Sequence, residues 1–467
     1  MRPKISHCIS NRSQIPSVSV ARLQVQRRAR PARYLLLQRI HRCLWGVLLG
    51  LLLSINARSG QAQVPAGTLT LDDCIHLAES APSSVRRARQ QAQIAKYGIT
   101  SAHANFLPQL SIYNGITYNS PLLYDRRAFS FIALNGIREY TTLVSSFLEI
   151  DTSGRLRAIL ARAHADRDAA NVNLELSARD LKLMVSASYY RVLLARKLAG
   201  SAQDNLHEAE TFEDRVRLLV KGGEASQADL AKASLETAVL ENALTQAELE
   251  VQLANHDLAS FWTTDVDTPL QLEDVLEDMP ATPEAENLNM PYLKRPEFKL
   301  FDAQADGYLA DAHLARAQLL PHLNLSFEYG IDATQVAMRD RGYAGFVNLE
   351  VPVFDWFRAR SEGRQFQQQA QQTANDKDIA KRVFSKEYQD ALAAVNSLYV
   401  QISVAERQVK YAKENLHLSR LRYEGGEGLA LDVVTAQTQL AQAQIAYYTT
   451  RANYLDARAT LDVASGR

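Results

Sequence analysis

Leu320-Pro321-His322-Leu323 repeats an earlier tetrapeptide, Leu107-Pro108-Gln109-Leu110. Two further matches follow in the same order: Glu149-Ile150-Asp151 with Val353-Phe354-Asp355, and Gly222-Gly223-Glu224 with Gly425-Gly426-Glu427. The offsets are 213, 204 and 203 residues, and an Asp stands six residues after each second glycine. Matches in a constant order and at a nearly constant offset indicate that the chain contains one structural unit twice.

Each copy of the tetrapeptide opens a pair of short segments in which apolar and polar residues alternate. The alternation is clearest at 323–331 and 343–354 and weaker at 109–119 and 140–150. Such alternation predicts strands with one apolar and one polar face. Loops 120–138 and 332–342 join the pairs. Aromatic residues that fit apolar or girdle positions are Phe327, Tyr329, Tyr343 and Phe346. The alternative is a soluble two-sheet core.

Between these segments the chain predicts long helices. It contains no proline between Pro121 and Pro269 and none after Pro352. Small and apolar residues recur in steps of three and four from Leu230 and again from Val433, which is a heptad pattern. The expected helices are 71–106, 155–221, 225–262, 293–319, 358–424 and 429–463.

The chain therefore contains two repeats, and each consists of a helix, two strands, a long helix, a tight turn and a further helix. We assign them to 63–267 and 293–467, with a proline- and acid-rich linker at 268–292. A helix of 67 residues is roughly 100 Å long. The two shorter helices of a repeat would match that length if stacked end to end. A lone soluble domain has little use for such a rod, whereas a conduit across a periplasm requires one.

The first 62 residues predict a signal peptide. They hold eleven Lys or Arg and no Asp or Glu, with an apolar run from Cys43 to Ile55 and small residues around Ala62, where we place cleavage. Thirteen apolar residues are too few for the alternative, a transmembrane anchor. Cys74 then stands alone and cannot form an intramolecular disulfide.

The remaining chain carries 41 basic and 52 acidic residues, which argues against a nucleic-acid partner. Its histidines are scattered without a His-x3-His pair, and no Gly-Lys-Ser follows either Gly-Gly-Glu. We therefore expect no enzyme activity, no metal site and no cofactor. Four strands are too few to close a transmembrane barrel, and lipid forbids unpaired edges. The strands need other copies, or they are not in a membrane.

In this order the motifs resemble those of the outer-membrane efflux proteins, the TolC-like channel tunnels. The resemblance runs from about residue 68 to the C-terminus. It rests on both Leu-Pro-x-Leu motifs, on the heptapeptide 349–355, on Arg295-Pro296-Glu297-Phe298, and on the two Gly-x5-Asp turns. It implies a mainly α protein whose trimer forms a twelve-stranded barrel in outer-membrane lipid and a helical tunnel in the periplasm. It also implies a passive exit duct of a tripartite efflux or type I secretion system. A periplasmic adaptor and an inner-membrane pump of RND, ABC or MFS type would open it.

The resemblance also implies roles for residues at the turns. Asp432 corresponds to an acid that rings the closed pore, and Thr435 stands where a second pore acid can occur. Tyr423 would link the inner hairpin to Asp229 of the outer one. The turn glycines that would dock the adaptor are Gly222, Gly223, Gly425 and Gly426. Gly428 departs from the pattern, because an Arg can link the hairpins there. The alternative role for both acids is helix capping.

Two other classes of protein compete with a duct. A periplasmic coiled-coil rod or an adaptor would also contain long helices, but an adaptor has one hairpin flanked by β-rich domains. Extraction discriminates, since only a membrane duct requires detergent. An enzyme is a distant third, because no cluster of ionisable residues supports one.

Overall fold

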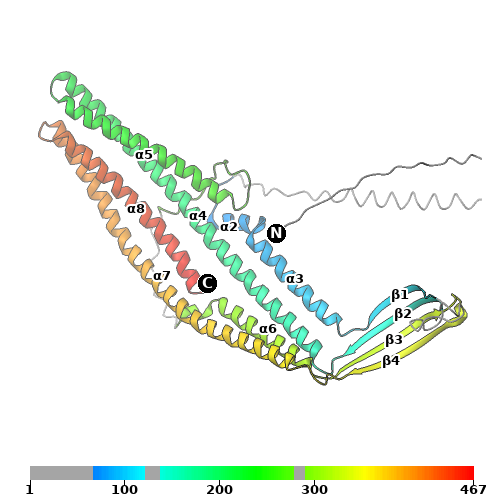
Figure 1. The fold of residues 1–467 in the computed structure, drawn as a ribbon. Coiled ribbons are helices and arrows are strands. Elements are labelled where there is room, and N and C mark those ends of the chain that lie inside the picture. Colours follow the sequence, from blue (N-terminus) through cyan, green and yellow to red (C-terminus); the bar gives the residue numbers. More distant parts are fainter. Residues whose placement is uncertain (1–66, 121–136, 278–289, 467) are drawn as a thin grey trace, which may run out of the picture. The chain divides into compact units, whose positions relative to one another are not determined.

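The computed structural model describes residues 67–120, 137–277 and 290–466. The expected signal peptide at 1–62 and most of loop 120–138 lie outside these residues. Figure 1 shows the helices and strands. In chain order they are α2 (Leu71–Ser80), α3 (Ser84–Ala104), β1 (Gln109–Tyr118), β2 (Arg138–Ile150), α4 (Arg155–Gly222), α5 (Gln227–Ala259), the 3-10 helix η1 (Pro291–Lys294), α6 (Glu297–Ala317), β3 (His322–Ala333), the 3-10 helix η2 (Met338–Asp340), β4 (Arg341–Glu350), α7 (Arg358–Glu424) and α8 (Ala430–Ala464).

Each long helix is accompanied by two shorter helices placed one after the other along its length. Helices α3 and α5 contact α4, and helices α6 and α8 contact α7 (Figure 1). The stacking expected from the segment lengths is confirmed. Helix α4 also contacts α6 and α8, so the two repeats pack against each other.

Two of the expected helices are interrupted, and proline is the cause in both. The prediction of one helix over 71–106 was wrong, because α2 ends before Pro82 and Ser83 caps the start of α3. Residue Ala81 is extended, with φ −73° and ψ 169°. The segment expected at 293–319 divides in the same way at Pro296 into η1 and α6. Proline lacks an amide N–H, and its ring disfavours helical geometry in the preceding residue.

The four strands form one antiparallel sheet in the order β1-β2-β3-β4. The central pair, β2 with β3, joins the first repeat to the second. Strand β4 ends at Glu350, so the expected strand to residue 354 was too long. Pro352 explains the difference, because it cannot donate to a ladder. Strand β3 runs on to Ala333, which shortens the loop expected at 332–342.

The register places most of the apolar residues of the four strands on one face, because directly paired residues point to the same side. The large apolar residues of this face, which we call the apolar face, are Leu110, Ile112, Ile116, Tyr118, Tyr140, Val144, Leu148, Ile150, Leu323, Leu325, Phe327, Tyr329, Ile331, Tyr343, Val347 and Leu349. Five polar residues, Asn114, Arg138, Thr142, Ser146 and Arg341, lie on the same face. Tyr113, Leu143 and Phe147 lie on the opposite face. Most of the opposite face is polar. Of the four aromatic residues proposed for apolar positions, Phe346 is the exception, since it pairs with Ser326 on the polar face.

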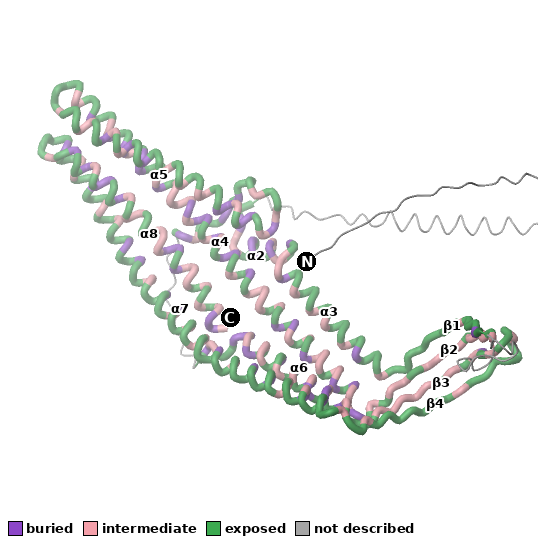
Figure 2. The backbone as a smooth tube through the Cα atoms, in the orientation of Figure 1, coloured by how far each residue is buried: buried purple, intermediate pink, exposed green. Residues whose placement is uncertain are grey.

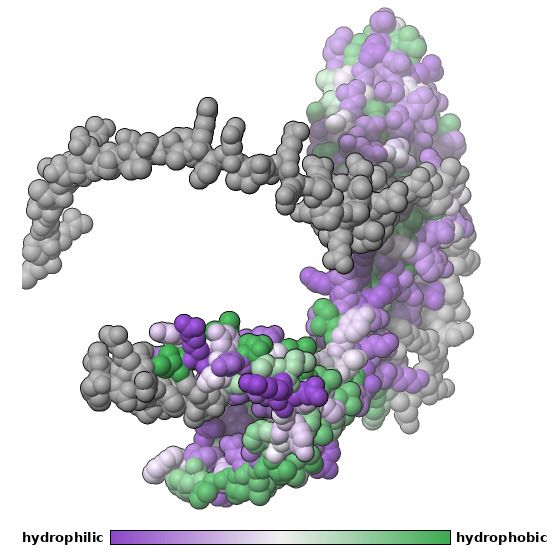
Figure 3. Space-filling view, turned by 90° about the vertical axis from the view of Figure 1, so that its right-hand side faces the viewer, coloured by the Kyte–Doolittle hydropathy of each residue, from purple (hydrophilic) through white to green (hydrophobic). Residues whose placement is uncertain are grey.

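The apolar face is open to its surroundings in the single chain. The exposed fraction is 69% for Ile112, 79% for Tyr343 and 72% for Val347. Figure 2 shows that buried residues lie mainly along the helices, whereas the sheet is mostly exposed or half-buried. Hydrophobic side chains gather along the lower rim of the sheet region in Figure 3. No element within the described residues covers this face.

The largest buried cluster surrounds α2 and the first part of the linker. Leu69 pairs with Leu272 in an isolated bridge, and the buried Tyr189 hydroxyl donates to the carbonyl of Glu273 at 2.8 Å. Burial, together with the charge of Asp73, raises the pKa of the Cys74 thiol to about 12, so this cysteine is a packed and unreactive thiol. Residues 268–277 are thus part of a core.

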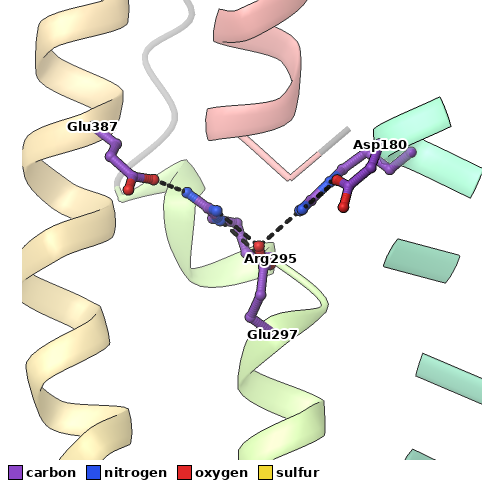
Figure 4. A network of polar contacts seen from close by, with 5 residues as sticks. Asp180, Arg295, Glu297 and Glu387 are labelled. Carbon is purple, nitrogen blue, oxygen red and sulfur yellow. Dashed lines mark hydrogen bonds and ion pairs between the residues drawn. The ribbon is translucent and has the colours of Figure 1, made fainter. Parts of the chain in front are cut away.

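A polar network joins α4, the start of α6 and α7 around the Arg295-Pro296-Glu297-Phe298 motif (Figure 4). The guanidinium of Arg295 is buried and lies 2.7 Å from Glu297 and 2.5 Å from Glu387. Arg179 of α4 reaches the same Glu297 carboxylate at 2.9 Å. The Arg295 guanidinium carbon also lies 3.7 Å from the centre of the Phe384 ring. One carboxylate therefore binds groups from both repeats.

Gly330 tests the importance of the β2–β3 pair. A Cβ at this position would overlap the carbonyl oxygen of Thr142 on the neighbouring strand, whereas a Cβ at Gly345 meets nothing within 4 Å. We expect Gly330→Ala to destabilise the protein by about 1–3 kcal/mol, as overpacking does, and Gly345→Ala to leave it nearly unchanged. Thermal unfolding in detergent measures both. Equal stability of the two variants would contradict the close approach of the strands.

Candidate functional site

The two hairpin turns have the same backbone conformation. Gly223 has φ 81° and Gly426 has φ 78°, a left-handed region that favours glycine. After each of them an amide N–H reaches back across the helix end, from Glu224 to Leu219 and from Glu427 to Arg422, both at 2.9 Å. Of the four glycines singled out from the sequence, these two are required by backbone geometry. Gly222 ends α4, and Gly425 has an ordinary φ of −77°.

Both turn acids cap the helix that follows. The Asp229 carboxylate accepts from the Ser226 hydroxyl at 2.7 Å and from the Ser226 N–H at 3.4 Å. Asp432 accepts from the Leu429 N–H at 3.2 Å, but Leu429 has no hydroxyl to reciprocate. The capping role considered from the sequence is therefore present at both sites. The Asp432 and Thr435 side chains are exposed in the single chain.

Tyr423 lies at the contact between the two hairpins. Its ring packs edge-to-face on Phe212 of α4, with centroids 5.2 Å apart. Its hydroxyl is buried and has no hydrogen-bond partner in the described part of the chain. Burial raises the pKa of Tyr423, and the negative charge of Asp229 raises it further. The two predicted partners are therefore close enough to interact electrostatically, but this conformation joins the hairpins through the aromatic contact.

Gly428 has a structural reason for its departure from the family pattern. A Cβ at this position would lie 2.9 Å from the amide nitrogen of Tyr423. Any larger residue would force the turn to shift, so an Arg link does not fit this turn conformation.

Other polar pairs connect the hairpins, and sequence reasoning missed them. Arg420 of α7 forms an ion pair with Glu208 of α4. The Thr438 hydroxyl donates to Glu236 at 3.1 Å, and the Asn205 amide donates to Gln444 at 2.8 Å. The sequence separations are 212, 202 and 239 residues, two of them close to the 203-residue offset of the repeats. A search for complementary residues within one position of that offset would have found the Glu236–Thr438 pair.

An apolar cluster lies beside these polar pairs near the turns. Its buried members come from all four hairpin helices: Phe212, Val216, Ala233, Leu416, Tyr423, Ala430, Val433, Ala436 and Leu440. Their burial removes apolar surface from water and so favours the paired state of the hairpins.

No helix among residues 67–120, 137–277 and 290–466 is both long and apolar enough to cross a membrane. In the same residues no three His, Cys, Asp or Glu side chains are arranged to hold a metal ion.

The long hairpins, the stacked helices and the small sheet with one apolar face define a channel-tunnel protein. The sequence matches the family described as outer membrane efflux protein over residues 74–263 and 292–467. The chain therefore belongs to the outer membrane efflux protein family. It is an outer-membrane exit duct for efflux, and its family and fold are those of passive channels.

Individual relatives agree with this assignment. The chain is 26% identical over 424 residues to the cobalt-zinc-cadmium resistance protein CzcC of Cupriavidus metallidurans, covering 88% of this chain and 94% of the relative. It is 26% identical over 396 residues to the pyoverdine export outer membrane protein OpmQ of Pseudomonas aeruginosa, covering 82% and 81%. Its fold is similar to the crystal structure of VceC from Vibrio cholerae, with a TM-score of 0.74 at 18% identity, covering 85% of this chain and 96% of VceC.

Arg420 provides a test of the contact between the hairpins. Its ion pair with Glu208 is partly exposed, so we expect a contribution of about 0.2–1 kcal/mol. Arg420→Ala should increase amide hydrogen exchange near both turns, by up to about fivefold for the upper figure. Arg422→Ala, an exposed neighbour with no ion pair among the described residues, is the control. Identical exchange in the two variants would show that the pair does not hold the hairpins together.

Proposed function

We propose that three copies of this chain assemble into a trimer whose strands close a twelve-stranded barrel in the outer membrane. The observation that carries this proposal is the sheet with one exposed apolar face, one polar face and two open edges. Alternating faces of this kind are typical of transmembrane barrels, with the apolar side toward lipid and the polar side toward the lumen.

The open edges support the same proposal. Strands β1 and β4 each have a neighbour on one side only. In lipid, every backbone N–H and C=O must find a partner within protein. Antiparallel pairing of β4 in one copy with β1 of the next would satisfy both edges. Four strands per copy then require at least two copies for the smallest barrels, and three give the twelve strands of the proposed trimer.

The helices extend the duct. We propose that residues 63–267 and 293–467 act as two repeats whose hairpins line a periplasmic tunnel, with 268–292 at its middle. The contacts of α4 with α6 and α8, and the shared Glu297 carboxylate, support a common unit built from both repeats.

We further propose that the turns around Gly222, Gly223, Gly425 and Gly426 dock a periplasmic adaptor, and that an inner-membrane pump of RND, ABC or MFS type supplies the cargo. The names of the relatives describe different cargo, cobalt, zinc and cadmium in one and pyoverdine in another. This variety favours a permissive duct in which the pump selects the substrate.

For the gate, we propose that three copies of Asp432 face one another across the closed end, with Thr435 one turn further along α8. Three like charges at close range repel one another. Closure would therefore depend on contacts between the hairpins, of which Tyr423 on Phe212 and Arg420 with Glu208 are candidates. An acidic ring would also attract cations into the mouth.

The membrane assignment is tested by two neighbouring residues on opposite faces of β1. Lysine at Ile112 would place a charge against lipid, at a cost of about 2–4 kcal/mol per copy near the midplane. Ser111→Lys places the same charge on the polar face. We expect Ile112→Lys to abolish recovery of trimer from the outer membrane and Ser111→Lys to preserve it. Native mass spectrometry of detergent extracts measures the trimer. A stable monomer of the unmodified chain would refute the proposed trimer. Extraction without detergent would refute the membrane location and favour a rod or an adaptor.

The gate is tested by removing charge while keeping the cap. Asp432→Asn retains an acceptor for the Leu429 N–H and loses the negative charge. We expect it to weaken block by multivalent cations in planar-bilayer recordings, whereas Thr435→Asp should strengthen block by adding charge nearby. Glu427→Ala, an exposed turn acid, serves as the control. Unchanged block in Asp432→Asn would leave Asp432 as a capping residue only.

A further inference from the structure

The segment between β4 and α7 has an unusual backbone. Trp356 and Phe357 have φ of 56° and 64°, and they are two of only three non-glycine residues with positive φ in the described ranges. The corresponding connection in the first repeat reaches α4 through Gly154, with φ 79°. Left-handed geometry costs a bulky side chain free energy that it does not cost glycine. The second repeat therefore maintains two large aromatic residues where the backbone favours glycine.

These aromatic residues project into open surroundings. The exposed fractions are 93% for Val353, 61% for Phe354, 83% for Trp356 and 61% for Phe357. We name these four residues the junction cluster. The Phe354 ring packs edge-to-face on Trp356 with centroids 4.8 Å apart, and on Phe357 at 5.9 Å. The rings thus support one another, and no other aromatic ring in the described chain packs on them.

Positive charge follows the junction cluster directly. Arg360 and Arg364 lie one turn apart on the same face of α7, both are exposed, and neither forms an ion pair within the described residues. The two arginines at the start of α4 behave differently, since Arg155 pairs with Glu149 and Arg157 pairs with Asp151. The first repeat neutralises its arginines internally, whereas the second leaves them available.

The local acids do not cancel this charge. Asp355 accepts from the backbone N–H groups of Phe357 at 2.9 Å and Ala359 at 2.8 Å, so its carboxylate caps α7. Glu362 is the only other acid between residues 351 and 364, against three arginines counting Arg358. An anionic partner therefore complements this surface.

We propose that the junction cluster inserts into the headgroup region of the inner leaflet of the outer membrane, and that Arg360 and Arg364 bind the phosphates of anionic lipids there. The proposal rests on the proposed function, which places the sheet in the bilayer. The junction cluster continues the strand whose Val347 and Leu349 belong to the apolar face, at the end where sheet changes to helix. Aromatic residues, tryptophan above all, are favoured at this level of a membrane, and arginine side chains can extend to the phosphates. Lipid contact would offset the backbone strain.

Fluorescence quenching tests the proposal with the mature chain in liposomes. The signal of Trp356 is obtained by subtracting a Trp356→Phe variant, which retains the buried Trp262 as an internal reference. We expect lipids brominated near the headgroup to remove most of the Trp356 emission and lipids brominated near the chain ends to remove little. Arg360→Gln with Arg364→Gln should abolish any increase in quenching caused by adding phosphatidylglycerol. Lys410→Gln removes a positive charge from an exposed site far along α7; it is the control and should change nothing.

A second probe separates this proposal from the proposed function. A Tyr343→Trp change in the Trp356→Phe background places a reporter on the apolar face of β4. If that reporter is quenched while Trp356 is not, the sheet is in lipid and the junction cluster is not, which overturns the present inference alone. If neither reporter is quenched, the membrane location of the sheet is refuted and this inference with it. Quenching of both, with the stated depth preference for Trp356, supports the proposal.

Discussion

An apolar sheet face that the chain does not cover is the constraint on which this protein depends. Four antiparallel strands place Ile112, Phe327 and Val347 on one side, and none of the described helices packs over them. Exposing such an apolar surface to water is unfavourable, and an isolated sheet also leaves the edges of β1 and β4 unpaired. Further copies of the chain and a lipid surrounding relieve both penalties together.

The two repeats have the same order of helices and strands, but they differ at particular residues in the turns and junctions. The two turns share the left-handed glycine and the acid six residues later, yet Ser226 completes the cap in the first repeat and Leu429 cannot do so in the second. The two strand-to-helix junctions differ in the same manner, one with a glycine and paired arginines, the other with exposed aromatic rings and unpaired arginines. Equivalent positions in the two repeats thus present different surfaces to their surroundings.

The polar network around Arg295 connects the two repeats, because Glu297 of the second repeat binds Arg179 of the first. Burial raises the pKa of Glu297, but hydrogen bonds from Arg295 and Arg179 outweigh that effect and leave its pKa below the ordinary value of 4.5. The carboxylate is therefore charged at neutral pH, and its contribution to stability is present above about 4.5 and is lost as the pH falls through the lowered pKa. Pro296, which stands between Arg295 and Glu297, separates η1 from α6, so that both neighbouring side chains belong to the network.

Local patterns in the sequence were sufficient for the elements that depend only on nearby residues. Helix α7 occupies the expected 358–424, and the four strands, the two glycine turns and the capping acids lie where periodicity and turn residues placed them. The effects of Pro82 and Pro352 were also local, yet the apolar periodicity on both sides of Pro82 and the alternation through Val353 concealed them. Tertiary structure alone decided the side of the sheet taken by Phe346, the aromatic contact of Tyr423 with Phe212, and the pairing of Arg420 with Glu208. Each depends on a register or on a contact between residues about 20 to 212 positions apart, and the pattern around one residue does not specify which distant residue will face it.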